Sequence, residues 1–214
     1  MRKVFWDDPY QTALQAVVVT VKENEILFDA TIIFSFCGGQ ESDRATINGM
    51  PVLSSRMDGL LIWYTLPAGH GLHKGDEVVM TIEWERRLRL MRLHFAAELV
   101  LELMTRLMPA AHKVGAHIAE SKARIDFKSD QNVSAVLAQI LEEYNRIITA
   151  NLPIIKEYSD VATQRRYWKI EGFAQVPCGG THVRTTGEVG FVTLKRERPG
   201  KGVERIEIRL KEAL

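Results

Sequence analysis

Cysteine is scarce in this chain, whose 214 residues include only Cys37 and Cys178. Two thiols cannot form the disulfide framework of a small secreted domain, so the fold has to rest on a hydrophobic core. The chain also lacks an apolar run of about 18 residues, the minimum for a membrane-spanning helix. Its start, MRKVFWDDPYQ, lacks the apolar segment of a secretory signal. We therefore expect a cytoplasmic protein that does not contact a membrane.

Charge of one sign is not in excess either. The chain has 28 Lys and Arg against 27 Asp and Glu, which gives a formal net charge of +1. A uniformly basic surface is thereby excluded and we expect no DNA partner, although a local basic face fits within a neutral total. The 46% hydrophobic and 26% charged residues are typical of a folded globular chain, long enough for one large domain or two modest ones.

The first 83 residues consist largely of short β-branched runs separated by turn residues. Two long runs flank the turn-prone segment Lys22-Glu23-Asn24. Further runs cover residues 45–47, 52–56, 60–66 and 77–82, with glycine beside asparagine or aspartate between them. Strands of this length and spacing are typical of a small barrel or sandwich.

The pattern changes at about residue 85 from a period of two to the helical period. Residues 83–108 contain neither glycine nor proline, and apolar side chains recur at helical spacing until Pro109 ends the run. We therefore expect two domains, residues 1–84 and 85–214. In the second we predict strands over 116–120, 123–127 and 154–158, helices over 133–151 and 160–166, and a hairpin of 189–197 and 203–210.

The loop Cys178-Gly-Gly-Thr-His182 combines a sulfur ligand with an imidazole. Gly179 and Gly180 let the chain fold back so that both side chains can face one ion, and zinc accepts both types of ligand. Taken alone, this spacing also fits a buried cysteine beside a surface histidine.

The helix over residues 83–108 offers complementary ligands. His94 and Glu98 stand at i and i+4 and therefore project from the same helix face. Alone they fit a pair on a helix surface. Together with Cys178 and His182 they make four candidate ligands, the number that tetrahedral zinc takes.

Arginines gather at the start of the same helix, where Arg86, Arg87, Arg89 and Arg92 lie within seven residues. The second half of the chain adds Arg165, Arg166, Lys195, Arg196 and Arg198. A phosphate-contacting surface is one interpretation, because arginine bonds phosphate oxygens in a bidentate manner. A solvated helix face balanced by Glu83 and Glu85 is the alternative.

A second glycine pair interrupts a strand in FCGGQESDRATI, where Gly38 and Gly39 precede Gln40. Adjacent glycines indicate unusual backbone angles or the close approach of another group. A plain turn is the alternative.

These motifs, in this order, resemble those of the free-standing alanyl-tRNA editing proteins (AlaX) and of the editing domain of alanyl-tRNA synthetase. FCGGQESDRATI is similar to the family's glycine-rich segment, RRLRLMRLHFAAELV to its ligand-bearing helix, GAHIAESKARIDF to the strand pair that follows, and CGGTHVRTTGEVG to its Cys-Gly-Gly-Thr-His loop. The likeness covers nearly the whole chain. One position departs: the family's His-x-x-x-His is His94-x-x-x-Glu98 here.

The resemblance implies an α+β protein with an N-terminal small β-barrel like that of translation factors. An α/β editing domain of the threonyl/alanyl-tRNA synthetase second-additional-domain type then follows. It also implies a trans-editing hydrolase that deacylates tRNA(Ala) mischarged with serine or, in some members, glycine. Zn²⁺ would be held by His94, Cys178 and His182, with Glu98 as the fourth ligand or as a base.

The same resemblance suggests roles for the remaining motifs. Glu98, Gln40 and Thr181 are candidate catalytic residues, and the tRNA would be bound by Gly38, Gly39, Arg86, Arg87, Arg89 and Arg92. The carboxylate at position 98 leaves other readings open: a weakened or inactive tRNA-binding homologue, a zinc hydrolase of another ester, or a structural zinc domain. The oligomeric state is not determined by the sequence.

Overall fold

The structure is a computed structural model that describes residues 1–211 and divides into two compact units. Unit 1 comprises Met1–Cys37 and Glu41–Leu88. Unit 2 comprises Gly38–Gln40 and the chain from Arg89 onward. The three residues Gly38–Gln40 thus belong to unit 2 although the segments on both sides of them belong to unit 1.

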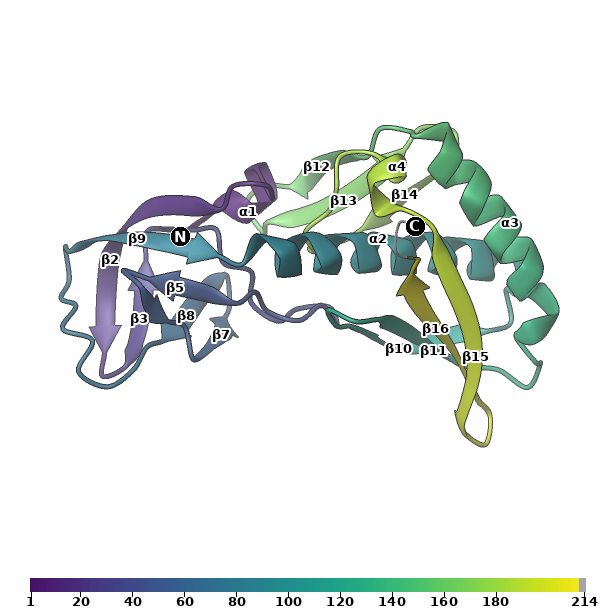
Figure 1. Cartoon of the computed structure of the whole chain (residues 1–214), viewed down its shortest axis with the longest axis horizontal. Helices are drawn as coiled ribbons and strands as arrows, with labels where there is room; N and C mark the ends of the chain where they lie inside the picture. The colour runs from purple at the N-terminus through teal and green to yellow at the C-terminus, as the bar shows by residue number, and fades with distance from the viewer. Residues whose placement is uncertain (212–214) are drawn as a thin grey trace. The chain divides into compact units, whose positions relative to one another are not determined.

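Unit 1 is built on a seven-stranded sheet with the order β6-β5-β9-β2-β3-β8-β7 (Figure 1). Its core contains Ile26, Ile47, Tyr64 and Met80, which have no exposed surface. The strands of this sheet are β2 (Ala13–Lys22), β3 (Glu25–Phe28), β5 (Ala45–Ile47), β6 (Met50–Pro51), β7 (Ser54–Asp58), β8 (Leu61–Thr65) and β9 (Glu77–Ile82). Two further strands, β1 (Arg2–Lys3) and β4 (Ala30–Thr31), pair with each other. The short helix α1 (Val4–Asp7) directly follows β1.

The strands predicted over residues 45–47, 60–66 and 77–82 are confirmed as β5, β8 and β9. Strand β9 alternates exposed and buried residues along its length, as a strand with one buried face must. Closure of the sheet into a small barrel stays a prediction, because β6 and β7 are the two ends of the hydrogen-bonded order.

A buried ion pair joins the start of the long helix α2 (Trp84–Leu107) to the rest of unit 1. The guanidinium of Arg87 is fully buried and bonds both carboxylate oxygens of Asp43. It also donates to the carbonyl oxygens of Ile32, at 2.6 Å, and Pro9, at 2.9 Å. The donors of the guanidinium are therefore used within unit 1, which satisfies a charge that would otherwise be costly to bury.

Unit 2 surrounds the remainder of α2 (Figure 1). A four-stranded antiparallel sheet, β10-β11-β16-β15, and a three-stranded sheet, β12-β13-β14, lie on two sides of the helix. The strands are β10 (His112–Ile118), β11 (Ala123–Lys128), β12 (Ile155–Asp160), β13 (Arg165–Ile170), β14 (Ala174–Pro177), β15 (Val192–Gly200) and β16 (Val203–Leu210). Because α2 is enclosed on more than one side, Leu90, Phe95, Leu99 and Val100 are all buried.

Helix α3 (Ser134–Ala150) confirms the amphipathic helix predicted over residues 133–151. It buries Ile140, Tyr144, Ile147 and Ile148, which recur at helical spacing. Asn151 ends the helix in the left-handed conformation, a common cap. Within residues 1–211 no helix is long and apolar enough to cross a membrane.

The short helix predicted over residues 160–166 is wrong. Asp160 ends β12, and its side chain accepts hydrogen bonds from the backbone of Ala162 and Thr163 and from the Thr163 hydroxyl. Gln164 then takes a positive φ of 54°. These local bonds favour a turn over a helix, so the segment closes the hairpin between β12 and β13.

The start of the last predicted hairpin is also corrected. Strand β15 begins at Val192 rather than at residue 189. The preceding residues form the short helix α4 (Thr186–Val189), in which Thr185 and Glu188 make a reciprocal capping box.

We predict that Arg87→Met destabilises the protein strongly. The change leaves the Asp43 carboxylate buried without its partner, which costs about 3–5 kcal/mol in the free energy of unfolding. Urea denaturation followed by circular dichroism measures the loss. The matched control is Arg44→Met, because Arg44 is exposed and pairs with Glu83 at 3.4 Å on the surface of the same unit. That variant should stay within about 1 kcal/mol of the wild type, and equal losses in the two variants would contradict the prediction.

Candidate metal centre

Helix α2 carries the first part of the centre. His94 and Glu98 lie one turn apart on one face of the helix, and His94 is only 4% exposed. The His94 Nε2 atom lies 3.4 Å from Glu98 Oε1. Both side chains therefore point to the same place, as their spacing predicted.

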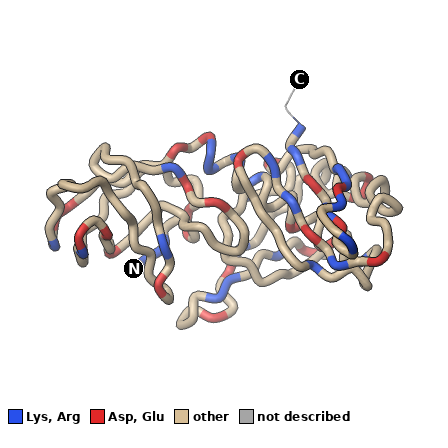
Figure 2. The backbone as a smooth tube through the Cα atoms, turned by 90° about the horizontal axis from the view of Figure 1, so that it is seen from below, with Lys and Arg blue, Asp and Glu red and all other residues tan. Residues whose placement is uncertain are grey.

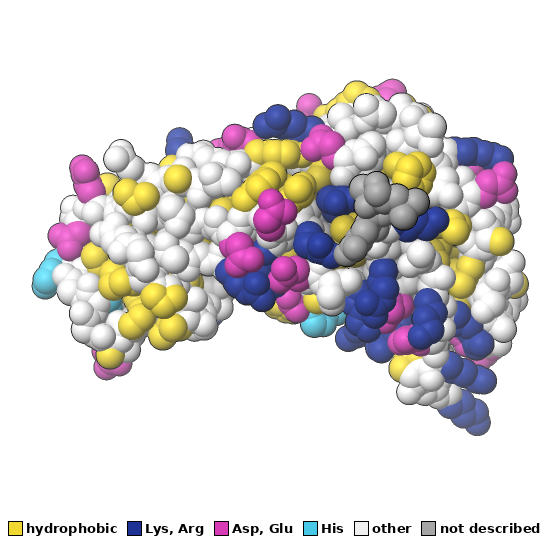
Figure 3. Space-filling model, in the orientation of Figure 1, with side chains coloured by type: hydrophobic (Ala, Val, Ile, Leu, Met, Phe, Trp, Pro, Cys, Tyr) yellow, Lys and Arg dark blue, Asp and Glu magenta, His cyan; other side chains and the backbone are white. Residues whose placement is uncertain are grey.

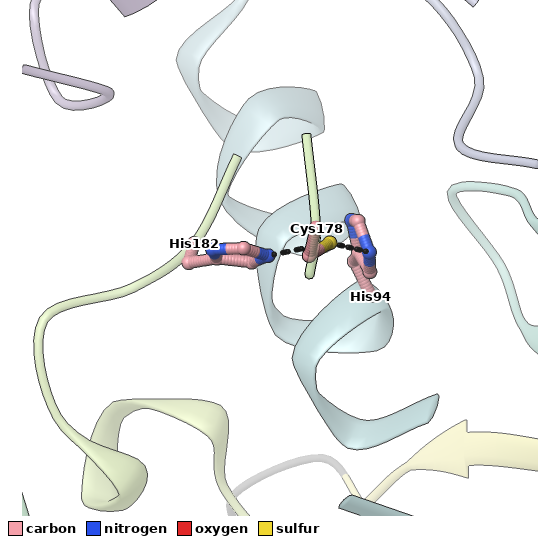
Figure 4. A group of neighbouring side chains, drawn as sticks. All are labelled: His94, Cys178 and His182. Atoms are coloured by element: carbon pink, nitrogen blue, oxygen red, sulfur yellow. Dashed lines mark hydrogen bonds between the residues drawn. The ribbon is translucent and has the colours of Figure 1, made fainter. Parts of the chain in front are cut away.

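The loop after β14 brings the second part. Cys178 directly follows the strand, and its backbone N–H donates to the Arg166 carbonyl at 2.9 Å. Its Sγ atom lies 3.4 Å from His94 Nε2 and 3.3 Å from His182 Nε2. Figure 4 shows the two imidazoles and the thiol pointing toward one another from α2 and from the loop.

Three ligand atoms thus converge in unit 2: those of His94, Cys178 and His182 all lie within 4.8 Å of one another. Zinc binds sulfur at about 2.3 Å and nitrogen at about 2.0 Å, so tetrahedral coordination places neighbouring ligand atoms about 3.5 Å apart. The two sulfur–nitrogen distances agree with that value. The donor set and its spacing therefore fit a tetrahedral metal ion, and this group of residues can hold one.

The tautomer of His94 is fixed by Gln40. His94 Nδ1 lies 2.5 Å from Gln40 Oε1 and donates its proton to that oxygen, which leaves Nε2 as the atom that faces Cys178. Ligand histidines usually bond a carbonyl or carboxylate in this way through the nitrogen that does not bind the metal. Gln40 Nε2 in turn donates to Thr181 Oγ1 at 2.9 Å.

The segment Gly38–Gln40 reaches this place by pairing with β10. Gln40 forms a parallel bridge with Ile118, whose N–H donates to the Gly39 carbonyl at 2.8 Å. Gly39 has a φ of +90°, and a Cβ there would lie 2.6 Å from the Ala116 carbonyl oxygen. The glycine is therefore required by both its backbone angle and the close approach of β10.

Gln40 and Thr181 are both buried beside the ligand group, with 0% and 1% of their surfaces exposed. The two side chains bond each other, and Gln40 also bonds His94. These bonds hold the ligand ring and the loop in position. A catalytic role for Gln40 and Thr181 stays a prediction.

Gly180 lies directly against the His94 ring. A Cβ at this position would lie 1.9 Å from His94 Cε1 and 2.3 Å from Nδ1. No side chain can be accommodated at such distances, so the loop can approach the ring only where it carries glycine. The second glycine of the Cys-Gly-Gly-Thr-His motif thus has a steric function.

Glu98 stands beside the three-residue group. Its Oε1 lies 3.4 Å from His94 Nε2 and 3.9 Å from Cys178 Sγ. Its Oε2 accepts a hydrogen bond from Trp168 Nε1 at 3.0 Å. Trp168, a fully buried residue of β13, was missed in the sequence. The available signal was the need of a buried indole N–H for an acceptor.

Burial and neighbouring charges move the pKa values of the cluster. Burial lowers the pKa of His94, but the adjacent Cys178 and the Glu98 carboxylate outweigh it and raise the pKa to about 10. Burial raises the pKa of Glu98, whereas its bonds to His94 and Trp168 bring it below its usual value. Burial and the charges of His94, Lys156 and Arg166 hold the pKa of His182 well below the usual histidine range.

The arginines at the start of α2 are used inside the protein. Arg87 is fully buried in its ion pair, and Arg86, 8% exposed, bonds Glu41 and the Ser42 carbonyl. The contact with tRNA predicted for these two residues stays a prediction. Arg89 donates to the Glu120 carbonyl and Arg92 to that of Val189, both from half-buried positions. Their contact with tRNA stays a prediction.

Exposed positive charge is found elsewhere in unit 2. In Figure 3, Lys and Arg side chains gather over the hairpin of β15 and β16, at the lower right of the view. Lys195, Arg198 and Lys201 of this hairpin are exposed. Figure 2 shows that acidic residues are interleaved along the same chain segments, so the charges are not separated by sign.

The sequence of this chain is similar to those of proteins that act on alanyl-tRNA. Residues 167–207 match the model of the threonyl and alanyl tRNA synthetase second additional domain, a segment that includes Cys178 and His182. An alanine–tRNA ligase of Methanococcus maripaludis is 29% identical over 95% of this chain, and one of Methanocorpusculum labreanum is 30% identical over 96%. In each case the match covers 25% of the ligase.

A free-standing relative matches from end to end. The alanyl-tRNA editing protein AlaX-M of Pyrococcus horikoshii is 31% identical over 97% of this chain and 96% of its own length. The chain therefore belongs to the AlaX family of alanyl-tRNA editing proteins.

We predict that Gly180→Ala weakens metal binding at this centre. The added methyl group occupies the space of the His94 ring and displaces a ligand, so we expect affinity for Zn²⁺ to fall by about 100-fold, the upper end of the range seen when the groups that orient a ligand are lost. Titration against a chelator of known affinity measures it. Gly115→Ala is the control, because its Cβ would lie 3.6 Å from Asp126 Oδ2, an ordinary contact. Unchanged affinity in Gly180→Ala would refute this geometry.

We predict that affinity for the metal rises with pH. The raised pKa of His94, about 10, means that the metal-free ring is protonated at neutral pH. A cation has to displace that proton, so binding tightens by up to about tenfold per pH unit for this proton and levels off above its pKa. Calorimetry at pH 6.5, 7.5 and 8.5, in buffers that differ in ionisation enthalpy, measures affinity and proton release. A pH-independent affinity would contradict the assignment of His94 as a ligand.

Proposed function

We propose that the protein is a trans-editing hydrolase that deacylates tRNA(Ala) mischarged with serine, and also with glycine, at a Zn²⁺ centre. The observation that carries the proposal is the convergence of His94, Cys178 and His182 in a chain that matches an alanyl-tRNA editing protein end to end. One sulfur and two imidazole nitrogens are a ligand set typical of zinc, with a fourth position left for water or substrate.

The need for such an enzyme follows from substrate size. A binding pocket for alanine discriminates poorly against serine, which adds only a hydroxyl, and against glycine, which lacks only a methyl group. Differences of this size supply about 1–3 kcal/mol, so a second hydrolytic site is required for accurate charging.

The residues of this chain would divide the work as follows. His94, Cys178 and His182 hold the ion, and Gln40 keeps the His94 ring oriented through the bond to Nδ1. When bound, zinc supplies Lewis-acid polarisation of the ester and of water. The buried surroundings of His94 and His182 limit the access of bulk water to the centre.

Glu98 would move the proton in the reaction. Its lowered pKa keeps it ionised at neutral pH, and its Oε1 faces the ligand group. In the proposed step a water oxygen bonds to the ester carbonyl carbon while Glu98 Oε1 accepts a proton from that water. The bond between the carbonyl carbon and the ribose oxygen then breaks, and the proton passes to the leaving hydroxyl.

The carboxylate at position 98 also supports a second candidate, a homologue that binds tRNA but hydrolyses slowly or not at all. Where the resemblance leads us to expect a second neutral histidine, this chain carries an anion. A negative charge beside the metal lowers its power to polarise the ester. The two candidates differ in one measurable quantity, the rate of ester hydrolysis.

We predict that the purified protein releases serine from Ser-tRNA(Ala) faster than alanine from Ala-tRNA(Ala), and that Glu98→Gln lowers kcat by about 10²- to 10⁴-fold. The amide keeps the shape of the side chain but cannot accept the proton. Deacylation of radiolabelled aminoacyl-tRNA measures both rates. Metal content, measured in the same samples, should stay near that of the wild type.

Cysteine variants provide the matched control. Cys178→Ser should lose both the metal and the activity, whereas Cys37→Ser, at an exposed position outside the centre, should keep both. Serine release no faster than without enzyme would reject the hydrolase and leave the tRNA-binding homologue, and a Glu98→His variant with a higher rate than the wild type would show that Glu98 is not the base.

A further inference from the structure

A pocket of about 580 Å³ opens beside Cys178 in unit 2. Its lining comes from two segments, the turn between β12 and β13 and the end of β14 with the loop after it: Ser159, Gln164, Arg165, Arg166, Pro177, Cys178 and Gly179. Its volume lies in the range of small-molecule sites, about 300–1,000 Å³. Because Cys178 belongs to both the pocket lining and the ligand group, the pocket adjoins the metal centre.

Arg166 is held next to Cys178 by the strand ladder. The hydrogen bond from Cys178 N to the Arg166 carbonyl extends the pairing of β13 with β14 by one residue. Arg166 also lies two residues from Trp168, so the two side chains share one face of the sheet, and Trp168 bonds Glu98 on that face. The Arg166 side chain therefore lies on the side of the sheet that carries the metal centre.

The pocket wall at this turn is positively charged. Arg166 is only 7% exposed, and its guanidinium carbon lies 5.0 Å from the centre of the Tyr158 ring, a cation–π contact. Arg165, the first residue of β13, is exposed and lines the same pocket. Its ladder partner Asp160 lies within reach of its charge and also accepts the hydrogen bonds from Ala162 and Thr163 that form the turn.

We propose that this pocket binds the 3′-terminal nucleotide of the aminoacylated tRNA, with Arg166 and Arg165 on its phosphate. The inference rests on the proposed function, in which the ester lies at the metal centre. The terminal ribose carries the ester on one side and the phosphodiester on the other, so the phosphate lies one sugar away from the reacting carbon. Arginine binds phosphate oxygens with two parallel N–H bonds.

Binding the phosphate would position the substrate rather than select it. Every tRNA carries this phosphate, and contacts to the phosphate backbone fix register without reading sequence. Held between Arg166 and Cys178, the ribose could present its ester to the metal centre in one orientation. Arg165 and Arg166 are thus positioning residues, and their contribution should appear with substrates that carry the phosphate.

The test compares two esters, Ser-tRNA(Ala) and 3′-O-seryladenosine, which lacks the phosphate. We expect Arg165→Gln to lower kcat/KM for Ser-tRNA(Ala) by about 10- to 100-fold, mainly through KM, since one hydrogen-bonded charge contact of this kind is lost. Hydrolysis of 3′-O-seryladenosine should be unchanged. Arg166→Lys keeps the buried charge but cannot form the two parallel N–H bonds of a guanidinium. It should therefore lower kcat/KM by several-fold for Ser-tRNA(Ala) but not for 3′-O-seryladenosine.

Arg146→Gln is the matched control, because the Arg146 side chain is 66% exposed on α3, pairs with Glu142 and does not line the pocket. It should lower kcat/KM for Ser-tRNA(Ala) by less than about twofold, the effect of one exposed charge. Equal losses on both esters in Arg165→Gln and Arg166→Lys would overturn the proposal, since the arginines would then act on the structure of the centre and not on a phosphate.

A binding measurement separates this inference from the proposed function. Adenosine 5′-monophosphate should bind the wild-type protein at least about tenfold more tightly than adenosine does, and Arg165→Gln should remove the difference. Calorimetry reads this out without hydrolysis. If the wild type hydrolyses no ester but still binds adenosine 5′-monophosphate more tightly than adenosine, the proposed hydrolase function is rejected and the pocket assignment is supported. If it binds the two compounds equally, the pocket assignment is overturned even in an active enzyme.

Discussion

The ring of His94 is the feature on which the centre of unit 2 depends, because separate segments of the chain meet on it. Gln40 bonds its Nδ1, Cys178 and Glu98 face its Nε2, and Gly180 packs against its edge. A ring held on these sides has a single orientation and a single tautomer. The ligand nitrogen is thus directed at the sulfur by bonds that involve neither a metal nor a substrate, and a preorganised site of this kind loses little on binding.

Charge balance explains how so many ionisable groups lie together in a buried place. In the metal-free protein the proton on His94 offsets the Glu98 carboxylate and the sulfur of Cys178, which is why the pKa of His94 is raised even though burial alone would lower it. A divalent cation can replace that proton among the same partners. Glu98 is further held by the indole of Trp168, so its second oxygen is fixed while the first faces the ligands. The anionic partners around His94 therefore favour a positive charge at this place, carried either by the proton or by a metal ion.

The arginines show that residue type does not determine role. Arg87 bonds Asp43 within unit 1, to which the start of α2 belongs, while Arg89 and Arg92 bond the backbone within unit 2. Exposed positive charge lies instead beside the β12–β13 turn, at Arg165, and on the β15–β16 hairpin. Arginines at the start of α2 thus make contacts within the protein, whereas some arginines on the β-hairpins are exposed. The sequence alone does not distinguish the two groups.

The sequence by itself determined the α+β class, the long helix, most of the strands and three side chains of the centre. The class and the elements follow from local periodicity, and the three side chains follow from the ligand chemistry of Cys178, His182 and His94. Both are properties of the residues themselves and can be read before the fold is known. The turn after Asp160 and the buried roles of Gln40, Thr181 and Arg87 were decided only by the tertiary structure. The reason is physical: hydrogen bonds and burial depend on which distant segments meet, such as Gln40 with Thr181, 141 residues apart along the chain, and no local pattern encodes that meeting.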